Sequence, residues 1–114
     1  MPSLINEDQV RNLKSLFNEG FDDFILLYFD DFEKKDKELA DTIQSNQLEK
    51  TKKLAHALKG NSLNVGATAL ADKCSAIELA SLTKNKDEVL VLYQDLEKLY
   101  PTVKQTYLQI VSSI

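Results

Sequence analysis

The stretch that decides the fold is "TKKLAHALKGNSLNVGA", residues 51–67. Lysine, leucine and alanine dominate its first half, and these residues favour a helix. Upstream, Asn46 is followed three residues later by Glu49, which is typical of a helix N-terminus. Gly66 suits the left-handed backbone that ends many helices. We therefore predict a helix that opens at Asn46 and runs to about Val65.

This helix holds the only histidine of the chain, His56. At about 100° per residue, Leu54, Leu58 and Val65 point in nearly one direction and form the expected core stripe. His56 lies about 180° from the middle of that stripe. We therefore expect His56 to face water, which disfavours a hydrogen-bonded core histidine. An exposed histidine without a role remains an alternative.

The helix face around His56 suits the approach of an anion. Three lysines surround the histidine although the chain has a formal net charge of −4; an ordinary solvated face is the alternative. Such a cluster lowers the cost of placing phosphate at the ring, and neutral imidazole is a competent nucleophile. Glycine inside a helix costs about 1 kcal/mol relative to alanine, so Gly60 suggests room for a docking protein. The candidate residues on this face are His56, Lys52, Lys53, Lys59, Gly60 and Leu63.

Helical spacing of hydrophobic residues continues through the rest of the chain. We predict helices over about 7–18, 21–45 and 67–82, and a last helix that continues past Pro101 with a kink. Capping signals support the first and the last of these helices. The first begins with Asn6 and Gln9 and ends at Gly20, and the last begins with Asn85 and Glu88.

These patterns predict an all-α fold. Of the 114 residues, 43% are hydrophobic, 28% are charged and only 3 are glycine, as in a soluble helical protein. No alternating pattern predicts a strand. We expect a single domain over residues 1–114, an antiparallel four-helix bundle with a short N-terminal capping helix. The first half of the helix at 21–45 is apolar nearly all round, so we expect the first helix to cover it, or a partner to bind there.

Composition excludes several classes of function. No signal peptide is visible, and the longest apolar run, "FILLYF", has six residues, too few to span a membrane. The acidic balance argues against nucleic acid. A single cysteine, Cys74, allows no internal disulfide, is expected in the core, and fits a cytoplasmic protein. One histidine and one cysteine are too few ligands for a metal site of these residues. The chain has no Gly-rich phosphate loop, so we expect it to bind neither ATP nor another cofactor.

Residues 55–78, "AHALKGNSLNVGATALADKCSAIE", resemble a histidine-containing phosphotransfer (HPt) domain. They show the pattern His-x-x-Lys-Gly-x-Ser, then the glycine that closes the helix, then the Leu and Cys of the next one. The resemblance implies that His56 is the phosphoacceptor on its outer ring nitrogen, that Lys59 neutralises the phosphoryl group and that Gly60 leaves room for the partner. Glu78 stands where some members have a glutamine that orients the histidine; an ordinary exposed residue is the alternative.

The resemblance also implies partners and a reaction. Leu63, with Leu13 and Phe24, would form an apolar docking patch beside the histidine. The chain would be a phosphorelay intermediate of a bacterial-type two-component system, accepting a phosphoryl group from a receiver-domain aspartate and passing it to another receiver. Its partners would be the receiver domains of hybrid histidine kinases and response regulators, which supply Mg²⁺. We expect a cytoplasmic, monomeric phosphocarrier rather than an enzyme with its own turnover.

Two alternatives to this interpretation are open. The first is a dimerising histidine domain of a sensor kinase, which usually has an acid adjacent to its histidine, whereas Ala57 follows here. The second is a non-catalytic helical adaptor that binds a response regulator, although an adaptor would not need His56, Lys59 and Gly60 together. The chain starts with Met and suggests a free-standing protein; a domain excised from a larger kinase would look the same.

Overall fold

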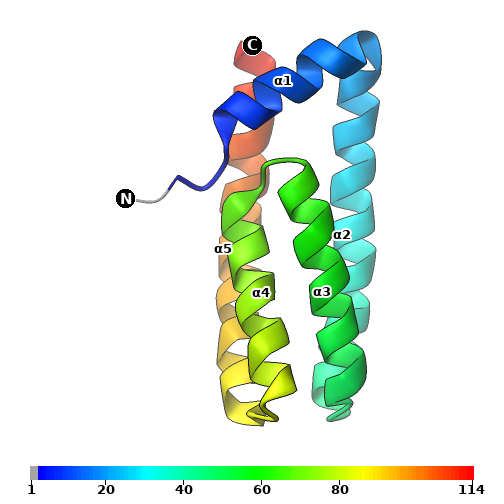
Figure 1. Ribbon diagram of the computed structural model, residues 1–114, viewed down its shortest axis with the longest axis vertical. Coiled ribbons are helices and arrows are strands. Elements are labelled where there is room, and N and C mark those ends of the chain that lie inside the picture. Colours follow the sequence, from blue (N-terminus) through cyan, green and yellow to red (C-terminus); the bar gives the residue numbers. More distant parts are fainter. Residues whose placement is uncertain (1–2) are drawn as a thin grey trace.

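The computed structural model describes residues 3–114, and within them every regular element is helical. Four long helices run antiparallel to one another, and the short first helix lies across one end of them (Figure 1). The predicted all-α bundle with a capping helix is confirmed. The elements are α1 (Glu7–Phe17), the 3₁₀ turn η1 (Asn18–Gly20), α2 (Phe21–Gln44), α3 (Leu48–Asn64), α4 (Thr68–Leu82) and α5 (Lys86–Ser113).

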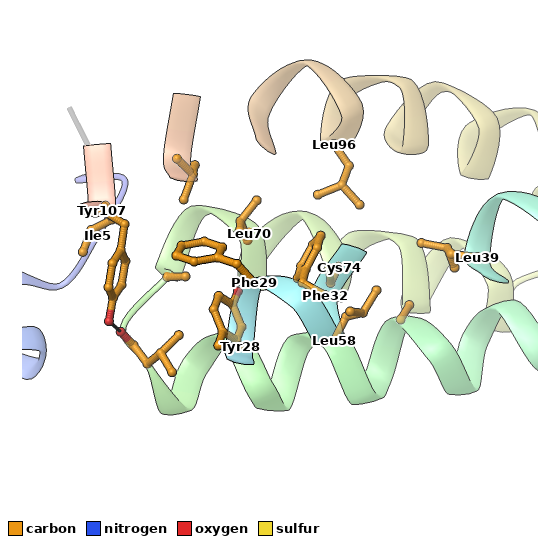
Figure 2. Packing of buried hydrophobic residues seen from close by; sticks show 14 of the residues in the cluster. Ile5, Tyr28, Phe29, Phe32, Leu39, Leu58, Leu70, Cys74, Leu96 and Tyr107 are labelled. Atoms are coloured by element: carbon orange, nitrogen blue, oxygen red, sulfur yellow. Dashed lines mark hydrogen bonds between the residues drawn. The ribbon is translucent and has the colours of Figure 1, made fainter. Parts of the chain in front are cut away.

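Aromatic side chains fill the centre of the core between α2 and α5. Phe29 meets Tyr107 edge-on, with 5.6 Å between ring centroids, and Phe32 stacks on Tyr100 at 4.9 Å. Such pairs add to the stabilisation that burial already provides. Cys74 lies fully buried among them (Figure 2), as predicted. Burial raises the pKa of its thiol to about 12, so we expect an unreactive thiol.

Two of the predicted caps form and one does not. The side chains of Asn6 and Asn85 accept from the backbone N–H of Gln9 and Glu88, at 3.2 and 3.1 Å. Asn46, however, has a φ of 58° and closes α2 instead of opening α3. Its N–H donates to the carbonyl of Ile43, and the next N–H donates to that of Thr42. This hydrogen-bond pair is a common helix C-terminus, and asparagine tolerates its left-handed conformation.

The stop of α1 also differs from the prediction. Asn18 is the residue with positive φ, 49°, whereas Gly20 has a φ of −80° inside ordinary helical space. Gly66 does take the predicted left-handed conformation, with a φ of 78°. It lies between α3 and α4 and allows the chain to reverse within three residues, 65–67. α5 passes through Pro101 without a break, as predicted.

The core stripe of α3 contains polar as well as apolar residues. Within α3 the buried residues are Thr51, Ala55, Leu58 and Ser62, while Leu54 is only partly buried. Leu58 and Val65 of the predicted stripe are buried, whereas Leu54 lies at its edge, so the centre of the stripe is displaced toward Thr51, Ala55 and Ser62. Hydrogen bonds from α2 offset the burial of the two hydroxyls: Thr51 donates to Thr42 at 2.9 Å, and Ser62 lies 2.7 Å from the Tyr28 hydroxyl.

Candidate functional site

His56 lies in the middle of α3 with its side chain 67% exposed, as predicted from the helical period. Its Nδ1 is 2.8 Å from Oε2 of Glu78, a residue of α4. The tight turn at Gly66 makes α3 and α4 pack along each other, which brings these two residues, 22 apart in sequence, into contact. An ionised carboxylate can only accept a hydrogen bond, so Nδ1 carries a proton, and in the neutral ring Nε2 has the lone pair.

Lys59 holds the other oxygen of the same carboxylate. Its Nζ lies 2.8 Å from Oε1 of Glu78, and the two side chains are 27% and 23% exposed. The hydrogen bond from Lys59 lowers the pKa of the Glu78 carboxyl below its ordinary value, burial opposes this, and the contact with His56 adds to the lowering. Glu78 is therefore a carboxylate at neutral pH, with one oxygen on a lysine and the other on the histidine ring.

Gly60 lies one turn after His56, and the protein leaves space around it. A Cβ added at Gly60 would meet no heavy atom within 4 Å. Internal packing therefore does not require glycine at this position, and the space is open to a second molecule. Leu63 and Lys53 are exposed on the same helix. Lys52 is engaged by its own helix, since it donates to Glu49 at 3.0 Å.

The apolar first half of α2 is covered only in part. Phe17, from the end of α1, stacks on Phe24 with 4.5 Å between ring centroids, and Leu13 is partly buried. Leu26 and Leu27 are still 51% and 66% exposed, so the expected lid leaves one side of α2 open. Of the three residues predicted as a docking patch, Leu63 is exposed and Leu13 and Phe24 are only partly exposed.

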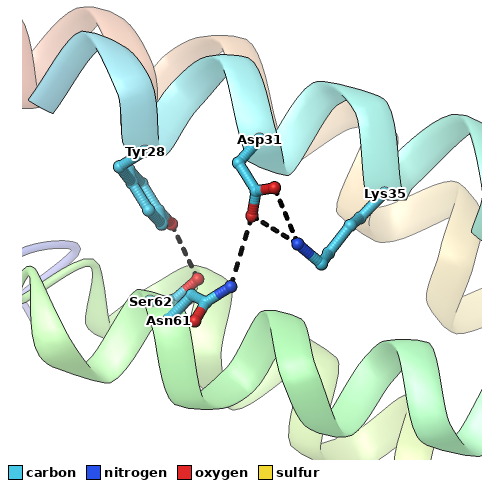
Figure 3. A network of polar contacts seen from close by, with 5 residues as sticks. All are labelled: Tyr28, Asp31, Lys35, Asn61 and Ser62. Carbon is cyan, nitrogen blue, oxygen red and sulfur yellow. Dashed lines mark hydrogen bonds and ion pairs between the residues drawn. The ribbon is translucent and has the colours of Figure 1, made fainter.

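A cleft of about 310 Å³ lies between α2 and α3 beside this exposed side. Two of its lining residues are joined by a hydrogen bond: Asp31 accepts from Asn61 at 3.3 Å and also binds Lys35 at 2.6 Å (Figure 3). This cleft was not predicted from the sequence, although Phe24 was expected as a docking residue and the first half of α2 is apolar nearly all round. The lining residues come from both helices and the turn after α3. They are Phe24, Leu27, Tyr28, Asp31, Asn61, Asn64 and Val65.

The lack of an acidic residue directly after His56 is not an argument against a dimerising histidine domain once the structure is known. Ala57 follows the histidine in sequence, yet Glu78 supplies a carboxylate at Nδ1 from the neighbouring helix. An acid beside the ring therefore no longer separates an HPt domain from a dimerising histidine domain. The number of chains in the assembly still separates them, because the dimerising domain needs two.

Residues 3–114 contain neither a metal-binding cluster nor a helix that could span a membrane. No group of three or more histidine, cysteine or acidic side chains in this range is arranged to hold a metal ion. None of the helices in the same range combines the length and apolar character that a membrane span requires.

Two solved plant structures share this fold. A rice protein described as a histidine-containing phosphotransfer protein superposes with a TM-score of 0.82 at 24% identity, covering 96% of this chain and 85% of its own. A histidine-containing phosphotransfer protein from maize superposes with a TM-score of 0.77 at 24% identity, covering 96% and 86%. At this identity the likeness shows the fold alone.

The sequence itself identifies the family. No curated protein matches the chain. The family model of the Hpt domain, however, matches residues 23–106, which is most of the chain and includes His56, Lys59 and Glu78. Members of this family carry phosphoryl groups in the phosphorelays of two-component signalling and interact with the receiver domains of kinases and response regulators. This chain belongs to the Hpt domain family.

Proposed function

We propose that His56 is the phosphoacceptor, which takes a phosphoryl group from the aspartyl phosphate of one receiver domain and passes it to the aspartate of another. The observation that carries this proposal is the environment of the ring. His56 is well exposed on α3, and its Nδ1 is held by Glu78 at 2.8 Å. The hydrogen bond at Nδ1 leaves the nucleophilic lone pair on Nε2, on the other side of the ring.

His56 and Glu78 neither gain nor lose a proton during the transfer. The Nε2 lone pair attacks phosphorus in line with the bond to the aspartyl oxygen. The Nε2–P bond forms as that P–O bond breaks, and the aspartate leaves as a carboxylate. Nδ1 keeps its proton, so the ring gains a positive charge. Transfer to the second receiver is the reverse of these changes, with that receiver's aspartate as nucleophile. Mg²⁺ bound by the receiver would stabilise the charge of the transferred group.

The surroundings of His56 support this proposal in two ways. Lys53 and Lys59, with Lys52, make a basic face in an acidic chain, and a basic face attracts the acidic pocket that binds Mg²⁺ in a receiver. Lys59 is a flexible point charge that moves from Glu78 to the phosphoryl group when the latter arrives. The open space at Gly60 admits the receiver's loops.

On this proposal the protein is a phosphocarrier, and the metal and most catalytic groups belong to the receiver domains of hybrid histidine kinases and response regulators. We further propose that residues 1–114 are a single Hpt domain. In support of this, described residues outside the family match pack on the same core: Ile5, Val10 and Tyr107 are buried in it. A monomeric state, a cytoplasmic location and a bacterial-type pathway remain predictions.

Transfer from a phosphorylated receiver domain tests the proposal. We expect acid-labile label on the native protein and none on His56→Gln. Lys50→Gln serves as a control, since it alters an exposed lysine of α3 outside the proposed site and should be labelled like the native chain. Label on neither the native chain nor the variants would favour the adaptor. Light scattering tests the other alternative, because a dimerising histidine domain would show twice the mass of one chain.

A further inference from the structure

We propose that Glu78 is a positioning residue that keeps the proton on Nδ1 of His56 after phosphorylation, so that the ring leaves phosphorus as neutral imidazole. This inference rests on the proposed function of His56. It concerns the second half of the relay, in which the protein gives the phosphoryl group away. It assigns to the negative charge of Glu78 a role beyond the orientation of the ring.

The leaving group makes the Nδ1 proton decisive. When the Nε2–P bond breaks, its electron pair returns to Nε2. If Nδ1 carries a proton, the departing ring is a neutral imidazole. If Nδ1 has lost its proton to water, the ring must depart as an imidazolate anion, which is a far stronger base and a far poorer leaving group. Retention of this proton therefore sets the rate at which the phosphoryl group moves on.

Glu78 is placed and charged to retain that proton. Its Oε2 is 2.8 Å from Nδ1, and Lys59 anchors Oε1 at 2.8 Å. In the unphosphorylated protein the bond from Lys59 lowers the pKa of the carboxyl, and the contact with the His56 ring lowers it as well. The contact with the ring persists when Lys59 moves to the phosphoryl group, so Glu78 remains an anion and does not take the proton itself. An opposite charge at this distance favours the protonated, cationic ring. A glutamine in the same place would accept the same hydrogen bond without supplying the charge.

Phosphorylation strengthens this pairing. In the unphosphorylated protein Lys59 and His56 share the carboxylate of Glu78. A phosphoryl group on Nε2 draws Lys59 toward its oxygens, and the carboxylate then faces the cationic ring alone. On α3 itself, Lys52 binds Glu49, and Lys53 is exposed and adds a further positive charge. Among the described residues, Glu78 is the carboxylate within ion-pair distance of the His56 ring. Glu78 is therefore the carboxylate that balances the ring's charge.

The isosteric variant Glu78→Gln separates charge from geometry. The purified chain is loaded with phosphoramidate, a small donor that needs no receiver, and release of inorganic phosphate to water is followed by ³¹P NMR from pH 5 to 10. We expect the pH of half-maximal release to lie about one unit lower in Glu78→Gln than in the native chain. Above both midpoints the variant then releases phosphate about tenfold more slowly.

A matched control removes the same charge from the same helix. Asp72 is exposed on α4, about 9 Å along the helix axis from Glu78, and Asp72→Asn should reproduce the native pH profile. Coincident profiles for Glu78→Gln and the native chain would overturn the inference, as would an equal shift in Asp72→Asn. If neither phosphoramidate nor a phosphorylated receiver loads His56 of the native chain, the proposed function itself fails.

Discussion

Gly60→Ala should make the protein more stable, although Gly60 lies where we propose that the receiver docks. Glycine in a helix interior costs about 1 kcal/mol relative to alanine. The added methyl group meets no atom within 4 Å, so nothing in the fold offsets that gain. We expect the free energy of unfolding to rise by about 1 kcal/mol, which raises Tm by about 4 °C for a chain of this size. Urea and thermal unfolding followed by circular dichroism measure both quantities.

The functional half of this prediction uses a larger side chain. Gly60→Glu places a bulky anion one turn from His56, where we propose that the receiver docks. Transfer from a phosphorylated receiver should slow by at least about tenfold, because bulk and like charge both oppose docking. Loading by phosphoramidate should stay near the native rate, because that donor needs no docking surface. A Gly60→Ala variant less stable than the native chain would refute the packing argument, and native transfer rates in Gly60→Glu would refute the docking argument.

Three further changes test other contacts. Lys59→Ala should slow phosphoryl acceptance from a receiver and return the pKa of Glu78 toward its ordinary value, as ¹³C NMR would show; an unmoved pKa refutes the role given to Lys59. Tyr107→Phe removes a buried 2.7 Å bond to the Val65 carbonyl and should cost about 1–2 kcal/mol in urea unfolding; no loss contradicts this. Burial and Glu97 raise the pKa of Asp36 to about 7, so folding stability should fall between pH 4 and 7, and Asp36→Asn should remove that fall.

The sign for Asp36 follows from proton linkage. The folded state holds the proton of Asp36 up to about pH 7, whereas the unfolded chain releases it near the ordinary pKa of an aspartate, 3.8. Between these pH values the folded state binds more protons, so rising pH favours unfolding. The geometry agrees, because Oδ1 of Asp36 is buried without a hydrogen-bond partner among the described residues. An equal pH profile for the native chain and Asp36→Asn would refute this assignment.

Local patterns were enough to predict the helices and the outward direction of His56. The helical period is a property of each segment, and the caps at Asn6 and Asn85 depend on residues three positions away. The same local reasoning failed where one residue had two possible roles. Asn46 has the pattern of a helix start, but its left-handed backbone closes the preceding helix. The buried stripe of α3 contains Thr51 and Ser62, whose hydroxyls depend on partners in α2.

The sequence by itself therefore determined which residues make the helices, that His56 faces solvent, and that Lys59 and Gly60 share its neighbourhood. Only the tertiary structure decided that Glu78 holds both the histidine and the lysine, because this contact depends on the register of α3 against α4. It also decided that α1 covers only part of α2 and leaves Leu27 exposed beside a cleft. Register and coverage arise from the packing of distant segments, which a helical period does not encode.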